Sequence, residues 1–177
     1  MKRCNDLKGW NVVYKHKRAM TLIGFSKRIR QSEGYVQCPA FWADYARRYK
    51  RLWQGAEPET AQERAVLDNG IGQYALCVMD EPDKFEYVIA GEYRGGEVPE
   101  GMKLYALPES EYAVFTERGA LPESLQRLNA AVWGEWLHGE GRACEGNGDT
   151  TVEVYPAGDP KRADDECGIW VPVKRKA

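Results

Sequence analysis

The order strand, helix, strand, strand occurs twice along this chain, and this repeat constrains the fold more than any other feature of the sequence. In the first half, alternating apolar residues and bounding turns predict strands over residues 20–26, 73–79 and 85–93. In the second half the same signals predict strands over residues 103–107, 111–116, 152–155 and 169–173. One long helix is expected in each half, over residues 39–53 and 123–137, and the stretch 58–67 is expected to add a helical turn or two.

The two expected helices carry similar apolar stripes. The stripes are Phe41-Trp42-x-x-Tyr45 in the first half and Val132-Trp133-x-x-Trp136 in the second. Residues three and four apart share one face of a helix, so each stripe is expected to pack on a sheet. The expected fold class is therefore α+β, with duplicated βαββ units of pseudo-twofold symmetry and an antiparallel sheet on which the helices pack.

We expect the chain, residues 1–177, to form a single domain made of two similar halves. The first half covers about 10–94, the glycine-containing linker 95–101, and the second half about 102–174. Ligand sites favour the seams between such halves, so a ligand is expected there.

Composition excludes several classes of protein. No apolar run approaches the ~20 residues that a bilayer-spanning helix needs, and the chain begins with polar sequence rather than a signal peptide. The five cysteines include no C-x-x-C pair, and there are only two histidines. This pattern favours free thiols in a reducing compartment. We therefore expect a cytoplasmic protein with no membrane association, no metal and no cofactor.

The charge is distributed unevenly along the chain. The first 51 residues hold 13 Lys and Arg against 3 Asp and Glu, although the net charge of the whole chain is −2. Such a basic segment can meet an acidic partner or nucleic acid, or it can pair with the acidic remainder after folding, which we favour. Residues 2–8 are too few for a helix-turn-helix, so direct nucleic-acid binding is not expected.

One acidic residue, Glu153, lies within the short strand pattern over residues 151–155. Alternate side chains of a strand share a face, which places Glu153 with Thr151 and Tyr155. That face either meets water, as in an ordinary half-exposed strand, or lines a cavity. A carboxylate beside aromatic rings in an apolar cavity is suited to binding lipophilic cations.

Five segments of the second half form a recognisable pattern: 98–108 (VPEGMKLYALP), 112–115 (YAVF), 132–137 (VWGEWL), 152–156 (VEVYP) and 169–174 (IWVPVK). In their order and spacing these segments resemble the GyrI-like small-molecule-binding family. This family includes the effector-binding domains of multidrug-responsive and AraC-type bacterial transcription regulators. The resemblance implies a duplicated βαββ fold with an aromatic pocket that often holds one buried glutamate. The loop over residues 138–141 departs from the family pattern, so the pocket rim is expected to differ.

Glu153 occupies the glutamate position of the family motif and is the first candidate for ligand binding. The other candidates are aromatic residues that form either pocket walls or ordinary core. They are Trp42, Tyr45, Tyr74, Tyr112, Phe115, Trp133, Trp136, Tyr155 and Trp170.

The leading hypothesis is a ligand-binding protein that senses or sequesters lipophilic, cationic small molecules. A second hypothesis, from the family resemblance, is a hydrolase of strained electrophilic rings that uses the same glutamate with a nearby tyrosine. The third is a protein-interaction module of the gyrase-inhibitor type. No nucleophile-base triad, phosphate loop or metal motif is present in the sequence, so catalysis is not indicated and no catalytic residue is assigned.

Overall fold

The computed structural model describes residues 11–139, 144–156 and 163–175. The chain divides into two compact units, one formed by residues 20–107 and the other by residues 1–19 together with 108–177. Each unit has its own antiparallel strands and helices. The N-terminal segment 2–8 and residues 140 and 141 of the expected pocket rim lie outside the described residues.

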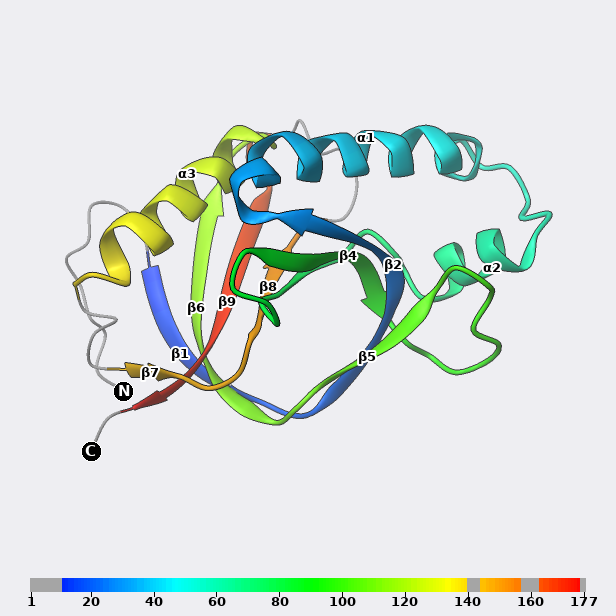
Figure 1. Ribbon diagram of the computed structural model, residues 1–177. Coiled ribbons are helices and arrows are strands. Elements are labelled where there is room, and N and C mark those ends of the chain that lie inside the picture. The colour runs from blue at the N-terminus through cyan, green and yellow to red at the C-terminus, as the bar shows by residue number, and fades with distance from the viewer. Residues whose placement is uncertain (1–10, 140–143, 157–162, 176–177) are drawn as a thin grey trace. The chain divides into compact units, whose positions relative to one another are not determined.

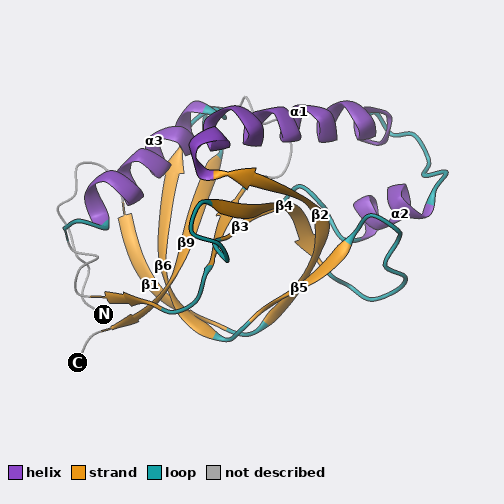
Figure 2. Cartoon of the chain, in the orientation of Figure 1, coloured by secondary structure: helices purple, strands orange, loops and turns teal. Residues whose placement is uncertain are grey.

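The unit of residues 20–107 has the strand order β3-β4-β2-β5 (Figures 1 and 2). Its elements are β2 (Met20–Arg30), the 3₁₀ turn η1 (Gln31–Glu33), α1 (Gly34–Trp53), α2 (Ala61–Asp68), β3 (Tyr74–Val78), β4 (Lys84–Glu92) and β5 (Lys103–Leu107). All paired strands in this unit are antiparallel. Helix α1 contacts β2 and α2, so its aromatic stripe packs on the sheet.

The second unit has the corresponding strand order β8-β9-β6-β1 (Figure 1). Its elements are β1 (Asn11–Lys17), β6 (Ser110–Arg118), α3 (Glu123–Ala131), the π-helical turn η2 (Val132–Trp136), β7 (Cys144–Gly146), β8 (Thr150–Val154) and β9 (Glu166–Arg175). Helix α3 lies against β6 and β9, and β7 pairs with the C-terminal end of β9. The predicted α+β class, with helices packed on antiparallel strands, is confirmed.

Two of the pairings join strands that lie far apart in the sequence. Strand β1 directly precedes β2 but pairs with β6, while β5 directly precedes β6 but pairs with β2. The expected linker, residues 95–101, lies between β4 and β5 inside the unit of residues 20–107. The assignment of residues 1–177 to a single domain stays a prediction.

The start of helix α1 differs from the predicted start at Pro39. Helix α1 begins five residues earlier than predicted, at Gly34, and contains Pro39. Proline lacks a backbone N–H, so it removes one bond near the start of the helix without ending it. The expected turns over 58–67 form α2, which is capped where the Thr60 hydroxyl accepts from the backbone N–H of Glu63 at 3.1 Å.

Each unit has a buried apolar interior. In the second unit, Phe115, Ile169, Leu128 and Val132 belong to a cluster in which β6 and β9 meet α3 and η2. Burial of this kind is the main driving force for packing a helix on a sheet. Among the described helices, none is both long and apolar enough to cross a bilayer.

Candidate functional site

Three side chains form a row across one face of the second unit. Phe115 on β6 pairs directly with Ile169 on β9, and Ile169 pairs directly with Glu153 on β8. Directly paired residues project to the same face of a sheet, so Phe115, Ile169 and Glu153 share one face. We call these three residues the acidic row.

The acidic row lies on the face that carries the buried cluster of this unit. Phe115 and Ile169 are members of that cluster, and the ring of Tyr155 packs against it. Glu153 itself is half-buried. The carboxylate therefore stands at the border of an apolar surface and not on an ordinary polar strand face.

Tyr155 forms a hydrogen bond with this carboxylate. Its hydroxyl donates to Glu153 Oε2 at 2.7 Å. This bond orients the carboxyl group of Glu153. A carboxyl group at the edge of an apolar and aromatic surface is the kind of chemistry that suits an organic cation.

Trp136 packs at the opposite end of the acidic row. Its ring meets the ring of Phe115 edge to face, with centroids 5.0 Å apart and an interplanar angle of 77°. Trp136 belongs to the π-helical turn η2, in which the backbone N–H of Leu137 donates to the carbonyl of Val132 at 3.0 Å. Turns of this type often occur at functional sites.

The other unit contains an equivalent row that lacks the acid. Phe25 on β2 pairs with Ile89 on β4, and Ile89 pairs with Ala75 on β3. The phenylalanine and the isoleucine recur at the corresponding strands, whereas a fully buried alanine stands where the second unit has Glu153. The carboxylate is therefore a feature of one row only and is not needed to build this kind of sheet.

Three predicted site residues lie in the unit of residues 20–107 and bond within it. Trp42 donates its indole N–H to the Tyr87 hydroxyl at 2.9 Å, and Tyr45 donates to the carbonyl of Ile71 at 2.7 Å. Burial, assisted by Tyr49, raises the pKa of Tyr45 well above its ordinary value. Tyr74 on β3 is half-buried, and burial together with Glu92 raises its pKa. These contacts stabilise the unit and are equally compatible with core and lining roles.

Two further candidates lie on the sheet face opposite the acidic row. Tyr112 and Trp170 alternate with Phe115 and Ile169 along β6 and β9, and their rings are 6.2 Å apart. The Lys17 ammonium lies 3.7 Å from the centroid of the Trp170 ring. The face of this ring is therefore already in contact with a cation of the protein itself. Burial, followed by the nearby Lys15, lowers the pKa of Lys17.

Trp133 points away from the cluster. It is 38% exposed, and its indole N–H donates to Asn129 Oδ1 at 3.1 Å. The structure thus brings four of the predicted residues together on one face and separates the rest. The four are Glu153, Tyr155, Phe115 and Trp136.

A surface hollow between α1 and β2 includes residues that sequence reasoning did not select. It is lined by Phe25, Ser26, Phe41, Asp44, Tyr45, Arg48, Tyr49 and Gly101. The guanidinium of Arg48 lies over the rings of Phe25 and Tyr49, at 5.9 and 5.5 Å from their centroids. Because a cationic side chain already covers these rings, the hollow is poorly suited to a second cation. Its apolar stripe on α1 was visible in the sequence, but the approach of Gly101 was not.

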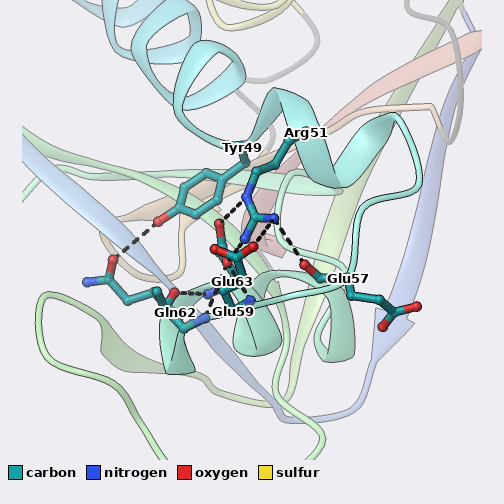
Figure 3. Close-up of polar contacts among 7 residues, drawn as sticks. Tyr49, Arg51, Glu57, Glu59, Gln62 and Glu63 are labelled. Atoms are coloured by element: carbon teal, nitrogen blue, oxygen red, sulfur yellow. Dashed lines mark hydrogen bonds and ion pairs between the residues drawn. The ribbon is translucent and has the colours of Figure 1, made fainter.

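Several basic residues of the N-terminal third pair with acidic residues of their own unit, as Figure 3 shows for Arg51. Arg51 donates from Nε to Glu63 Oε1 at 2.9 Å, with a further guanidinium contact to the same carboxylate. The Arg51 guanidinium, and then the backbone N–H of Glu59, hold the pKa of Glu63 below its ordinary value. Arg28 pairs with Asp80 in the same way. These pairs join α1 to α2 and β2 to the loop after β3.

Among residues 11–139, 144–156 and 163–175, no group of three or more His, Cys, Asp and Glu side chains could hold a metal ion. Cys144 and Cys167 are free thiols. Cys167 donates to the Ser124 hydroxyl at 3.5 Å, and burial raises the pKa of its thiol. A buried thiol of raised pKa is a poor nucleophile, so Cys167 has a structural role.

Comparison with known proteins agrees with the fold. A family model described as integron-associated effector-binding protein matches residues 15–173. The structure of SAV2435 bound to tetraphenylphosphonium is similar to this chain, with a TM-score of 0.73, 22% identity and coverage of 93% of this chain and 94% of that one. The integron cassette protein VCH_CASS2 from the mobile metagenome of Vibrio cholerae is also similar, with a TM-score of 0.60, 13% identity and coverage of 94% and 100%.

A curated relative matches part of the chain. The transcriptional regulator BrlR of Pseudomonas aeruginosa is 31% identical over 81 residues, which are 45% of this chain and 30% of BrlR. The chain therefore spans about 30% of the length of the curated relative that it matches.

The fold and the match over residues 15–173 define a small-molecule-binding protein of the effector-binding class. The chain belongs to the integron-associated effector-binding protein family. The family resemblance drawn from residues 98–174 is thereby confirmed, and the match extends it through the first half of the chain.

Proposed function

We propose that this protein binds lipophilic, cationic small molecules at the acidic row, with Glu153 as the residue that recognises the positive charge. The observation that carries the proposal is the position of Glu153 on the apolar face of its unit, where Tyr155 orients the carboxylate. The equivalent row of the other unit has Ala75 at this position, so the acid serves no general structural need. Binding of this kind suits a protein that senses or sequesters such compounds.

The comparisons support the choice of ligand class. SAV2435, which is similar in fold, has been solved with tetraphenylphosphonium, a lipophilic organic cation. Such a cation has weakly held hydration water, so an apolar surface with a single carboxylate can bind it through ring contacts and charge together. Tyr155 supplies the ring beside Glu153, and Phe115 and Trp136 supply rings farther along the same face.

The test uses two ions of equal shape and opposite charge. Tetraphenylphosphonium and tetraphenylborate differ in sign, so their affinities separate the role of charge from that of apolar contact. Glu153→Gln should weaken binding of the phosphonium by about tenfold or more, which is about 1.4 kcal/mol, and should leave or improve binding of the borate. Equal losses for both ions in calorimetric titrations would show that Glu153 has only a structural role. Glu145→Gln, on the exposed strand β7, is the matched control.

A second candidate function rests on the same hydrogen bond. A carboxylate 2.7 Å from a tyrosine hydroxyl can act as a general base while the tyrosine supplies a proton, as the opening of a strained electrophilic ring by water requires. Turnover of an epoxide, lost on both Glu153→Gln and Tyr155→Phe with the fold retained, would favour this function. Association with a protein partner and the lack of direct nucleic-acid binding stay predictions.

A further inference from the structure

The indole N–H of Trp136 is a buried donor without a hydrogen-bond acceptor among the described residues. The Trp136 side chain is 1% exposed, so water does not replace the missing acceptor at the surface. Native structures keep few such donors, because a buried N–H without a partner has lost its bonds to water and gained none. The isolated donor therefore suggests a partner that binds from outside the chain.

The local backbone buries this donor. A regular α-helix would place Trp133 and Trp136, three residues apart, on nearly the same face. In the wider π-helical turn η2 the two side chains separate, and Trp133 is 38% exposed while Trp136 is buried. Trp133 satisfies its own indole N–H through Asn129. Of the two indoles, only the buried one lacks an acceptor among the described residues.

Trp136 is connected to Glu153 through the acidic row. Its ring packs on Phe115, and Phe115 and Glu153 stand two strands apart in the acidic row. Neighbouring strands are about 4.8 Å apart, so the row spans about 10 Å. A cation in contact with the carboxylate occupies about 4 Å of this length. A ligand that extends from the carboxylate along the row would approach the end at which Trp136 packs on Phe115.

We infer that Trp136 donates its indole N–H to the bound effector, which narrows the ligand class to lipophilic cations that carry a hydrogen-bond acceptor such as a carbonyl oxygen or a ring nitrogen. This inference rests on the proposed function at the acidic row. The N–H is already without water in the free protein, so only the ligand's acceptor loses hydration on binding. The gain from one new bond is for that reason larger than at an exposed donor.

Two probes of nearly equal shape test the inference. (4-Acetylphenyl)triphenylphosphonium carries a carbonyl acceptor, and (4-isopropylphenyl)triphenylphosphonium replaces it with methyl groups. The wild-type protein should bind the acetyl compound about tenfold more tightly than the isopropyl compound. Equal affinities of the two cations for the wild-type protein would overturn the inference.

The variants remove the N–H while keeping an aromatic group. Trp136→Phe is the simple change. Replacement of Trp136 by β-(3-benzothienyl)alanine is the closer one, because sulfur takes the place of the N–H in a bicyclic ring of the same shape. In both variants the preference for the acetyl compound should fall to within about twofold. A preference that survives in the benzothienyl variant would mean that the indole N–H is not the donor to the acetyl group, which would also overturn the inference.

Glu153→Gln separates this inference from the proposed function. If the variant loses affinity for both cations while the acetyl preference is absent in the wild-type protein, the inference fails and the proposed function stands. If neither cation loses affinity in Glu153→Gln, the proposed function fails.

Discussion

The Tyr155 hydroxyl donates to the Glu153 carboxylate across 2.7 Å, so the acid of the candidate site and its donor come from the same end of β8. Tyr155 also packs its ring on the cluster that contains Phe115 and Ile169. Tyr155 therefore both packs on the apolar cluster and orients the carboxyl group of Glu153.

We expect Tyr155→Phe to lower the free energy of unfolding by about 1.5 kcal/mol, because it removes a donor to a charged group and keeps the packed ring. In a Glu153→Gln background the same change should cost clearly less, since an amide accepts a weaker bond. Urea unfolding of the four proteins in a double-mutant cycle measures the difference. Losses that add without coupling would show that the bond contributes nothing to stability.

The Arg51–Glu63 pair predicts a pH-dependent stability of the α1–α2 contact. The folded protein holds the pKa of Glu63 below its unfolded value, so the pair stabilises the fold above that unfolded value, and the stabilisation is lost as pH falls through the lowered pKa. Glu63→Gln should therefore lower Tm at pH 7, and the gap to the wild type should shrink from about pH 4.5 downward.

Glu59→Gln is the matched control for this change. Glu59 also contacts Arg51, at 3.2 Å, but its side chain is 77% exposed, against 12% for Glu63. Exposed ion pairs contribute little to stability, so Tm should hardly change. A pH-independent gap for Glu63→Gln, or an equal loss for Glu59→Gln, would argue against the pair as the source of stability.

The contact of Lys17 with Trp170 gives a third prediction. Lys17→Met keeps the length of the side chain and removes the ammonium that lies 3.7 Å above the ring, which should lower the free energy of unfolding by about 0.5–1 kcal/mol. Lys15→Met, on the same strand and exposed, should change it by less than about 0.5 kcal/mol. If chemical denaturation gives the two variants the same stability, the cation–π contact has no measurable weight.

Much of this fold could be predicted from the sequence because its strands alternate and its helices carry continuous stripes. Strand β1 was missed because its basic and apolar residues give no clear alternation, and β7 because three residues are too few for a pattern. Glu153 was selected as a candidate from alternation within β8 and from its place in the family motif. The acidic row itself depends on register, and pairing between distant strands cannot be worked out from one strand's pattern.

The sequence also predicts only in part which aromatic candidates share a face. Tyr112 and Phe115 are three residues apart on β6, so strand alternation already predicts opposite faces for them. Trp133 and Trp136 could not be separated in this way, since helical spacing places them together and only the π-helical turn η2 divides them. The hollow beside Arg48 was also hidden, because Gly101 approaches it from a distant loop.

The most direct test of cation binding at Glu153 is the position of the ligand in a crystal of the complex. Tetraphenylarsonium has the shape and charge of tetraphenylphosphonium, and its arsenic atom can be located by anomalous scattering. We predict an arsenic peak within ~6 Å of the Glu153 carboxylate, on the face that carries Phe115 and Tyr155. A peak in the hollow beside Phe25 and Arg48, with no peak near Glu153, would contradict the account.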